Sequence, residues 1–468
     1  MQSGVTVVIL AAGLGTRMKS RKAKVLHRAG GRTLIGQAVA TARALAPPER
    51  IFVVVGHQAE EVRSAVDTPG LGFIEQREQN GTGHAVLVGR AALEPLGAYL
   101  VIVYGDGPLL RAATLRRLIA TADEGAHQGD SAGVLLSAIM DDPTGYGRVV
   151  RDRDGAVACI VEQKAASPEQ LAIREANMGI YCFRSDLFWK HAGEMRPDNA
   201  AKEYYLTDMV AILRRAGHSM GAVVIEDARE ALGINSRVEL AEVDRLLRER
   251  KLRDLMLGGV TIEKPETVTI DPDVSIGEDT VIGPFTQILG KTRIGKECTV
   301  GACSIVEDSE IGDQVHIGAF TLVGSSRVER GAHIGPFARL RFGNHVEEGA
   351  HVGNFVELKK AHMGAGAKAN HLAYLGDAEI GARTNIGAGT ITCNYDGAHK
   401  HRTTIGKEAF VGSNATLVAP LEIGDGSYLA AGSVITDAVP PEALALGRAR
   451  QVLKPEWAAK RKKAAKGL

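Results

Sequence analysis

Short apolar runs alternate with amphipathic stretches through the first half of the chain. Val5–Leu10, Ile51–Val55, Tyr99–Tyr104 and residues 133–138 have the length and composition of buried strands, and residues 33–46 show helical spacing. Strands and helices that alternate in this way predict βαβ units and a mostly parallel sheet. Ligands of such sheets bind at the carboxyl ends of the strands, so functional motifs are expected directly after them.

A different pattern occupies residues 236–257, where apolar side chains recur at helical spacing among Glu, Asp and Arg. Gly258 and Gly259 follow, as is typical of a helix end. We expect a charged amphipathic helix that connects two domains. Its apolar positions are Val238, Leu240, Val243, Leu246, Leu247 and Leu255.

In the second half, an aliphatic residue returns at every sixth position and is usually followed by glycine. A strict period of six does not stay on one side of a helix with 3.6 residues per turn, which argues against amphipathic helices. It fits short strands that each point one residue inward, with glycine permitting the turn to the next side. The pattern predicts a parallel β-helix whose coils are stable only when stacked, with a projecting loop at residues 394–402. The positions in register are Ile276, Ile282, Ile288, Ile294, Val300, Ile311, Ile317, Val323, Ile334, Leu340, Val346, Val352, Leu358, Ile405, Val411, Leu417, Ile423 and Leu429.

The length of the chain indicates how many domains it has, and its charge balance argues against binding to nucleic acid or membranes. At 468 residues the chain is too long for one ordinary core, so two domains are expected. Lys plus Arg number 56 and Asp plus Glu number 55, which leaves no overall field to attract nucleic acid or an anionic membrane. A site for a phosphorylated ligand must therefore draw its charge from a few local side chains.

Cysteine usage and the start of the sequence predict a cytoplasmic protein. The five cysteines are widely spread without a Cys-x-x-Cys pair, and no histidines cluster at zinc spacing, so we expect neither disulfides nor a structural metal. The sequence runs from Met1 into an apolar strand without a basic leader, and no segment approaches the roughly 20 apolar residues of a membrane span.

A glycine-rich turn follows the first apolar run. Residues 10–18 read LAAGLGTRM, and Lys24 comes shortly afterwards. Glycines allow backbone N–H groups to approach phosphates, while Arg17 and Lys24 supply local positive charge. A tight turn alone would also account for the glycines, but it would not require the two cations.

Two further polar motifs follow apolar runs. Residues 76–85 read QREQNGTGHA, in which a side-chain amide such as that of Gln76 can complement the imide edge of uracil. A polar loop is the alternative. Asp106 closes an apolar strand, where its carboxylate could hold Mg²⁺ against phosphate oxygens, although an Asp in this place is also a common turn former.

These stretches resemble the signatures of sugar-1-phosphate nucleotidyltransferases, and residues 76–85 resemble the uracil-binding motif of bacterial N-acetylglucosamine-1-phosphate uridyltransferases. The resemblance implies a Rossmann-like α/β domain, UTP as co-substrate, Mg²⁺ held by Asp106 and Asn235, and catalytic roles for Arg17 and Lys24. Ala23 and Gly107 stand where the family usually has proline and valine. The implied UTP- and UDP-N-acetylglucosamine-binding residues are Leu10, Ala11, Ala12, Gly13, Lys24, Gln76, Gly81, Thr82, Tyr104, Gly105, Asp106, Gly147, Glu162, Asn177 and Asn235.

Uridylyl transfer suits this set of residues. The nucleophile is a phosphate oxygen of the sugar phosphate, which is already ionised at neutral pH, so no protein base is required. The reaction needs alignment on the α-phosphorus of UTP and neutralisation of charge while pyrophosphate leaves. Mg²⁺, Arg17 and Lys24 would supply the positive charge.

The predicted β-helix carries charged departures from its repeat. On the repeats alone, such a stack could be only a platform for oligomerisation. Arg339, Arg341 and Lys359 interrupt neutral coils, however, and predict a second phosphate site. His371 is suited to accept a proton near neutral pH, and acetylation of an amine requires that an ammonium group lose one.

Residues 337–395 closely resemble the glucosamine-1-phosphate N-acetyltransferase half of the same bifunctional family, and residues 385–397 match it almost letter for letter. The resemblance implies a left-handed β-helix, a homotrimer with acetyl sites between neighbouring stacks, and His371 as the general base, oriented by Glu357. Phe342 stands where the family usually has proline. The implied ligands of glucosamine-1-phosphate are Arg341, Lys359, Tyr374 and Asn385, and those of acetyl-CoA are Ala388, Asn394, Tyr395, Ser413, Ala431 and Arg448.

The resemblance extends in the same order to about Arg448, and the chain is identified as a member of this bifunctional family. We expect a uridylyltransferase domain at 1–233, a linker helix at 234–259, an acetyltransferase β-helix at 260–453 and a basic tail at 454–468. The resemblance implies that acetyl-CoA and glucosamine-1-phosphate give N-acetylglucosamine-1-phosphate. UTP then converts this intermediate into UDP-N-acetylglucosamine and pyrophosphate, for bacterial cell-wall precursors.

Two other functions fit part of the pattern. A nucleotidyltransferase for another sugar or nucleotide, with a β-helix used only for assembly, would not need His371, Lys359 and Arg341 on its coils. A regulatory or scaffold protein descended from such enzymes would be expected to lose Lys24 or Asp106, yet both are present. These residues favour an enzyme with two sites.

Overall fold

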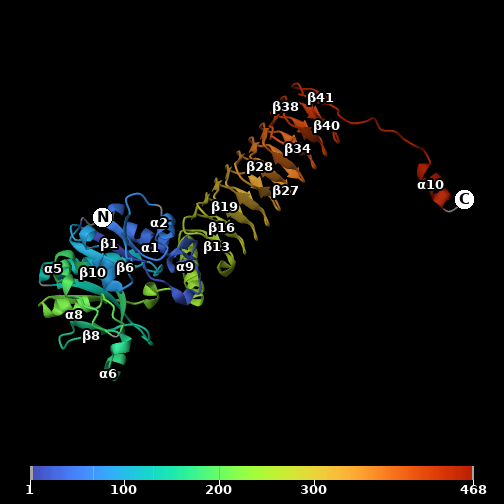
Figure 1. Cartoon of the computed structure of the whole chain (residues 1–468). Helices are drawn as coiled ribbons and strands as arrows, with labels where there is room; N and C mark the ends of the chain where they lie inside the picture. The colour runs from blue at the N-terminus through green and yellow to red at the C-terminus, as the bar shows by residue number, and fades with distance from the viewer. Residues whose placement is uncertain (1–3, 67, 130, 200, 466–468) are drawn as a thin grey trace. The chain divides into compact units, whose positions relative to one another are not determined.

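The computed structural model describes residues 4–66, 68–129, 131–199 and 201–465, so Met1 and the end of the basic tail, from residue 466, lie outside the described residues. The chain divides into two compact units, Met1–Arg248 and Glu249–Leu468 (Figure 1). The boundary falls within helix α9 (Arg237–Leu257), in the region where the sequence predicts a connecting helix.

A nine-stranded sheet forms the centre of the first unit, as far as its residues are described. Strands β5, β4, β1 and β6 are parallel neighbours, as the sequence predicts, and β11 runs parallel to β7. Strand β10 is antiparallel to both β6 and β7, so the sheet is mixed rather than mostly parallel. The strands are β1 (Val5–Leu10), β4 (Ile51–Val55), β5 (Gly72–Glu75), β6 (Tyr99–Tyr104), β7 (Ser131–Ile139), β8 (Arg148–Arg151), β9 (Val157–Val161), β10 (Glu175–Arg184) and β11 (Ser219–Ile225), with a separate hairpin of β2 (Arg28–Ala29) and β3 (Arg32–Thr33).

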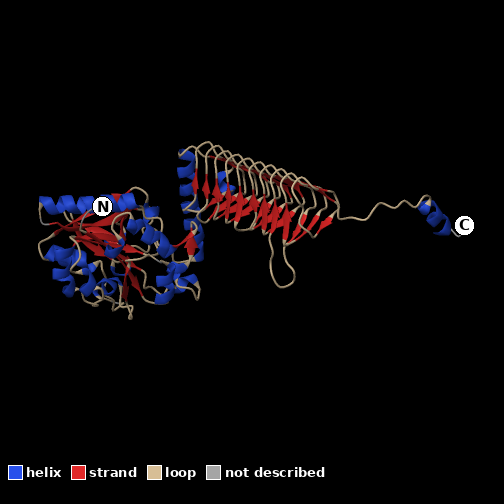
Figure 2. Cartoon of the chain, turned by 90° about the horizontal axis from the view of Figure 1, so that it is seen from above, coloured by secondary structure: helices blue, strands red, loops and turns tan. Residues whose placement is uncertain are grey.

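Helices cover both faces of this sheet (Figure 2). Successive side chains of β1 point to opposite faces, so Val7 and Ile9 pack with α1, α2 and α5, whereas Val8 packs with α3, α4, α7 and α8. The α-helices are α1 (Leu34–Arg43), α2 (Ala59–Ala65), α3 (Thr82–Leu87), α4 (Arg90–Leu93), α5 (Ala112–Gln128), α6 (Pro168–Leu171), α7 (Ser185–His191) and α8 (Asp208–Arg215). The 3-10 turns are η1 (Thr16–Met18), η2 (Lys24–Leu26), η3 (Pro48–Arg50), η4 (Gln163–Ala165), η5 (Ala192–Glu194), η6 (Ala228–Ala231) and, in the second unit, η7 (Pro265–Thr267).

Helix α9 belongs to two cores. In the first unit, Val243 is buried in a small cluster with Met18 and Leu34. In the second unit, Leu252 is part of the long core of the β-helix, and Lys251 donates hydrogen bonds to backbone carbonyls at its first coil. Val238, which the helical pattern places among the apolar positions, is exposed instead.

The second unit is a parallel β-helix whose described strands form three sheets along its length. Its first side consists of β12 (Thr261–Ile262), β15 (Val281–Ile282), β18 (Thr299–Val300), β21 (His316–Ile317), β24 (His333–Ile334), β27 (His351–Asn354), β30 (Lys368–His371), β33 (Asn385–Ile386), β36 (Phe410–Val411), β39 (Tyr428–Leu429) and β41 (Leu444–Ala445). Its second side consists of β13 (Thr269–Ile270), β16 (Gln287–Leu289), β19 (Ile305–Glu307), β22 (Leu322–Gly324), β25 (Arg339–Leu340), β28 (Glu357–Lys359), β31 (Tyr374–Gly376), β34 (Ile391–Cys393), β37 (Thr416–Val418) and β40 (Val434–Ile435). Its third side consists of β14 (Ser275–Ile276), β17 (Arg293–Ile294), β20 (Glu310–Ile311), β23 (Ser326–Val328), β26 (Asn344–Val346), β29 (His362–Met363), β32 (Ala378–Ile380), β35 (Thr403–Ile405) and β38 (Leu421–Ile423).

The register predicted from the period of six is confirmed. The aliphatic residues of the series are buried in one continuous core, except Ile276, which is partly buried against it. Among the glycines that directly follow these residues, Gly335 alone has a positive φ, of +87°, so the expected reason for the glycines is wrong at the others. Gly283 does not need a positive φ, but a Cβ there would lie 2.7 Å from the backbone nitrogen of Ala302 in the next coil. The positive φ of +58° in this coil belongs to Phe285.

The loop at residues 394–402 leaves the stack between β34 and β35, as predicted (Figure 2). An antiparallel bridge joins Tyr395 to Lys400 across the loop. The Asp396 carboxylate accepts hydrogen bonds from the N–H groups of Ala398 and His399, at 2.7 and 2.6 Å. The loop is therefore ordered by its own contacts. After β41 the exposed chain continues to α10 (Trp457–Ala465), which lies in the predicted basic tail.

Shortening a side chain inside the stack should destabilise the β-helix far more than shortening its outward neighbour. We expect Ile288→Ala to cost about 2–5 kcal/mol of unfolding free energy, because it leaves a cavity in a continuous core. Gln287→Ala, on the exposed side of the same strand, should change it by about 0.5 kcal/mol or less. Urea unfolding followed by circular dichroism measures both, and equal effects would contradict the inward register.

Candidate functional site

A cavity of about 310 Å³ opens in the first unit where β1, β5 and β6 end. It brings together the glycine-rich turn, the polar segment after β5 and the acidic end of β6, three motifs that lie far apart in the sequence. Their meeting follows from the topology, because parallel strands have their carboxyl ends at one edge of a sheet. The lining residues are Leu10, Ala11, Ala12, Gly13, Lys24, Val25, Gln76, Gln79, Gly81, Thr82, Ala85, Tyr104, Asp106 and Glu203.

Lys24, Asp106 and Asn235 converge at this cavity. The Lys24 ammonium forms an ion pair with the Asp106 carboxylate and donates a hydrogen bond of 3.2 Å to Asn235 Oδ1. The side chains of Lys24 and Asp106 are only 14% and 17% exposed, so the pair is partly shielded from water. Two oxygen atoms, from Asp106 and Asn235, thus approach one positive charge.

Backbone contacts fix the polar segment after β5. Gln76 is buried, and its Nε2 donates to the carbonyl of Gly81 at 3.2 Å and lies 3.1 Å from Nδ1 of His84. Gly81 has a φ of +103°, and a Cβ there would lie 2.5 Å from the carbonyl oxygen of Tyr204. Position 81 therefore requires glycine, because the segment approaches the backbone of Tyr204 closely there.

Gly147, Glu162 and Asn177 lie together, at a distance in sequence from the turn. The Asn177 N–H donates to the carbonyl of Gly147 at 2.8 Å, and a Cβ at Gly147 would lie 3.6 Å from Glu162 Oε1. Burial raises the pKa of Glu162; the Thr207 hydroxyl, which donates to it at 3.3 Å, opposes this, and the Asp208 charge adds to it. Burial also raises the pKa of Asp208.

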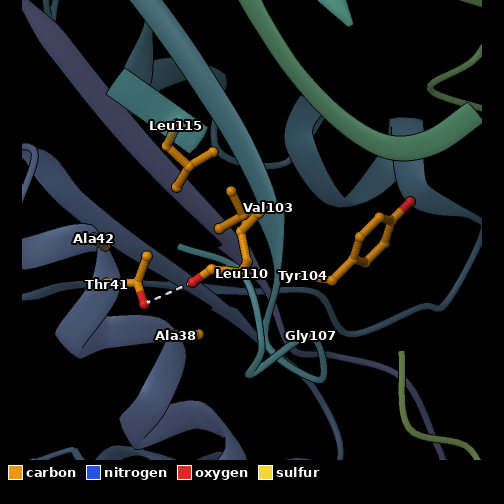
Figure 3. A pocket seen from close by; sticks show the side chains of 8 residues that line it. All are labelled: Ala38, Thr41, Ala42, Val103, Tyr104, Gly107, Leu110 and Leu115. Atoms are coloured by element: carbon orange, nitrogen blue, oxygen red, sulfur yellow. Dashed lines mark hydrogen bonds between the residues drawn. The ribbon is translucent and has the colours of Figure 1, made fainter. Parts of the chain in front are cut away.

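Tyr104 connects these residues to the cavity. It lines the cavity, and burial raises the pKa of its hydroxyl, with further contributions from the Asp106 and Glu162 charges. A separate void of about 10 Å³ lies on the other face of β6. Figure 3 shows that Val103 and Leu115 face one another there, whereas the Tyr104 side chain points away. Gly107 also lines this void, so it lies behind the acidic end of β6.

Arg17 does not line the cavity. It lies exposed in η1, and Met18 beside it is buried. Gly105, Gly147, Glu162, Asn177 and Asn235 are likewise outside the cavity lining, although Asn235 contacts Lys24. Some of the predicted nucleotide-binding residues therefore line the cavity, and the others lie outside its lining.

Cations gather on the β-helix around Phe342. Arg341, Lys359 and Lys360 each place their charged group 5.8–5.9 Å from the centre of the Phe342 ring. Arg341 also donates to Glu357 Oε1 at 3.3 Å. The Lys359 side chain is buried, which is costly for a charge without an anionic partner.

Lys400, from the projecting loop, contacts this group. Lys359 lowers the pKa of Lys400 by its hydrogen bond and charge, while Asp377 and Tyr374 oppose the shift. Two ammonium groups from different segments thus lie side by side. Because like charges repel, the pair favours an anion such as a phosphate between or beside them.

His371 is exposed at the end of β30, where it is in parallel register with Asn354. Glu357, predicted to orient it, accepts its hydrogen bond from Arg341. Asn394 is buried and donates to Asp377 Oδ2 at 2.5 Å. The Tyr374 hydroxyl and the Asn394 amide lie 2.4 and 2.8 Å from the point that a Cβ of Gly376 would occupy, so these two residues are neighbours.

The remaining predicted residues follow the stack. Ala388, Ser413 and Ala431 occupy one corner in successive coils, since Asn414 N–H donates to Ala388 and Gly432 N–H to Ser413. Asn385 lies opposite Lys368 on the first side. Tyr395 is exposed in the loop, and Arg448 is exposed after β41.

Comparison with known proteins matches both units. Residues 7–153 fit the model of the MobA-like NTP transferase domain, and residues 273–308 and 402–437 fit that of the bacterial transferase hexapeptide repeats. Bifunctional protein GlmU from Solibacter usitatus is 68% identical over 100% of this chain and 99% of its own length. Those from Koribacter versatilis and Trichlorobacter lovleyi are 49% and 47% identical, each over 97% of this chain and over 97% and 98% of their own lengths.

The chain belongs to the GlmU family. It is accordingly a bifunctional enzyme, a uridylyltransferase in its α/β unit and an acetyltransferase in its left-handed β-helix, with a nucleotide and acetyl-CoA as substrates. Among the described residues, no helix combines the length and apolar character needed to cross a bilayer.

Several residues of this GlmU chain lie at its candidate sites without having been singled out from the sequence, among them Glu203, Lys360 and Lys400. Glu203 lines the cavity, although it lies far along the sequence from the motifs at residues 10–18 and 76–85. Lys400 reaches the cations at Phe342 only because the projecting loop folds back through the bridge at Tyr395. A lone lysine in a polar loop carries no signal of that contact.

Gly107 offers a test of the geometry behind the acidic end of β6. A Cβ there would have 3.9 Å to its nearest neighbour and needs no positive φ, so Gly107→Ala should raise the unfolding free energy by about 0.4–1 kcal/mol. The matched variant Gly105→Ala should lower it, because its Cβ would lie 3.2 Å from side chains of Ala11 and Ile35. Thermal unfolding distinguishes them, and destabilisation by Gly107→Ala would contradict the geometry.

Proposed function

We propose that the two activities of the GlmU family reside at the two clusters described above. The cavity of the first unit transfers the uridylyl group of UTP to N-acetylglucosamine-1-phosphate and releases pyrophosphate. The cluster on the β-helix transfers the acetyl group of acetyl-CoA to glucosamine-1-phosphate. The observation that carries the first assignment is the meeting of Lys24, Asp106 and Asn235 at the cavity.

A divalent ion fits the first cluster. The oxygens of Asp106 and Asn235 already contact one cationic group, and carboxylate and amide oxygens are ligands that Mg²⁺ accepts. Asp106 and Asn235 would hold Mg²⁺, which when bound neutralises charge on the phosphates of UTP.

The residues of the chain position the two reactants. Lys24 and Arg17 bind phosphate oxygens, and the backbone of residues 10–13 approaches the nucleotide closely. Gln76, held by Gly81, presents its amide to uracil together with Thr82. Gly147, Glu162 and Asn177 bind the sugar, whose ionised phosphate attacks the α-phosphorus without a protein base.

On the β-helix, Arg341, Lys359 and Lys400 bind the phosphate of glucosamine-1-phosphate, and Tyr374 and Asn385 orient the sugar. His371 takes the proton that the amino group loses as its nitrogen forms the amide bond, and coenzyme A leaves as a thiolate that takes up a proton to give the free thiol. Ala388, Asn394, Tyr395, Ser413, Ala431 and Arg448 line the acetyl-CoA site.

We infer that the enzyme is a homotrimer in which a neighbouring β-helix completes each acetyl site. Exposure of His371, Tyr395 and Arg448 supports this, because a single chain leaves these groups open to water. We also place the enzyme in the cytoplasm and propose the domain limits 1–233, 234–259, 260–453 and 454–468. Gel filtration with light scattering tests the trimer.

Replacing one key residue at each cluster should separate the activities. His371→Ala should lower acetyl transfer roughly 100-fold or more by removing the base, and leave uridylyl transfer near normal. Asp106→Ala should do the reverse by removing a ligand of the metal. Thiol and pyrophosphate release measure the two steps.

His316→Ala serves as the control, since His316 is exposed on the same side of the β-helix as His371. It should leave both activities unchanged. Equal loss of both activities in either test variant would contradict two separate sites.

Lys400 should act on substrate binding. Lys400→Met should raise the KM for glucosamine-1-phosphate roughly 10-fold with a smaller effect on the KM for acetyl-CoA, since it removes one charge-assisted phosphate contact. Lys291→Met, in an exposed position of an earlier coil, is the matched control. An unchanged KM for the sugar phosphate would remove Lys400 from the site.

A further inference from the structure

The third side of the β-helix carries a second cluster of titratable groups. His345 of β26 and His362 of β29 are in direct parallel register, and their rings are stacked with centroids 4.9 Å apart and planes 3° from parallel. Glu347 directly follows β26, and Glu379 of β32 is in register with His362. The mechanism proposed above uses none of these residues.

Three of these side chains can reach one point. Donor atoms of His345, Glu347 and His362 all lie within 4.8 Å of one another, and no other group of three or more potential metal ligands occurs in the described part of the chain. His362 Nε2 is 2.8 Å from Glu347 Oε1. The three side chains are 30–38% exposed, which leaves them room to rotate toward an ion and leaves an ion a path of entry.

Further contacts fix the orientation of His362 and Glu347, as is usual for metal ligands. The other ring nitrogen of His362, Nδ1, contacts the carboxylate of Glu379, and this carboxylate also forms an ion pair with Arg402. Glu347 accepts the N–H of Ala365 at 2.8 Å through its second oxygen. A carboxylate behind a metal-binding histidine fixes its tautomer and orientation, and such support commonly accounts for 10–100-fold in affinity.

We propose that His345, Glu347 and His362 form a binding site for a divalent ion of the zinc class, which ties adjacent coils of the β-helix together. Two imidazole nitrogens and one carboxylate suit Zn²⁺, Co²⁺ or Ni²⁺, whereas Mg²⁺ prefers oxygen ligands throughout. Glu329, 2.7 Å from His345 Nε2, is placed to supply a fourth ligand. The site is independent of the proposed function and of the Mg²⁺ assigned to Asp106.

The spacing of the ligands explains why no motif in the sequence indicates this site. The two histidine ligands, His345 and His362, are 17 residues apart, which is one coil of the stack, and Glu379 behind His362 lies a further 17 residues on. Zinc motifs are recognised by ligands a few residues apart on one turn or helix. Here stacking, rather than local chain geometry, brings the ligands together.

Equilibrium dialysis of the full chain tests the site. The protein, freed of any affinity tag and stripped with EDTA, is dialysed against ZnCl₂ in excess Mg²⁺, and bound zinc is measured by mass spectrometry. We expect one Zn²⁺ per chain and a roughly 10-fold or greater loss of affinity in His362→Gln. Visible ligand-field bands of tetrahedral Co²⁺ should appear in the parent chain and be lost in His362→Gln.

His351→Gln is the matched control, because His351 stacks on His333 at 4.7 Å on the first side of the β-helix, away from this cluster. It should bind zinc as the parent chain does. Glu347→Gln, nearly isosteric, replaces His362→Gln if circular dichroism shows that the latter is unfolded. Absence of bound zinc in the parent chain, or equal binding by the parent and the ligand variants, overturns the proposal.

Discussion

Pairing between a few cationic side chains and oxygen acceptors of the chain is the interaction on which both candidate sites depend. With 56 basic and 55 acidic side chains, the protein has no general field to attract phosphates, so binding must come from local charges. Partly buried charges are costly unless paired. Lys24 meets this requirement with Asp106 and Asn235, and Arg341 meets it with Glu357. Lys359 and Lys400 instead contact each other, so their shared surface favours an incoming phosphate.

Much of the fold follows from periodicity. The period of six specified which residue of each short strand points inward, and Ile317 and Leu340 are buried as that pattern requires. Strand direction was not accessible in the same way. An apolar run such as β10 has the same composition whether it runs parallel or antiparallel, so the mixed character of the first sheet appears only in the structure. The glycines show a similar limit, because the close approach of Gly283 to Ala302 is a contact between coils that no local pattern reports.

The candidate site residues also fall into those that the sequence pattern could place and those that it could not. Gln76 and Asp106 follow strands whose carboxyl ends meet at one sheet edge, so the topology alone brings them to one cavity. Lys400 reaches Lys359 only through the folding of the projecting loop, and His345 and His362 meet only because coils stack one above the other. The contact between Glu357 and Arg341 shows a different difficulty, since the motif does not report that Arg341 donates to this carboxylate, and the orientation of His371 by Glu357 stays a prediction. Contacts of this kind depend on side-chain competition, which a motif does not encode.

Both activities depend on two independent phosphate-binding clusters in one chain, and complementation tests this separation most directly. Asp106→Ala and His371→Ala proteins are mixed with glucosamine-1-phosphate, acetyl-CoA, UTP and Mg²⁺, and UDP-N-acetylglucosamine is measured by chromatography. We expect the mixture to form this product although neither variant does so alone, because the acetylated intermediate made by Asp106→Ala is used by His371→Ala. A mixture as inactive as its components, with each variant folded, would contradict the assignment of separate sites.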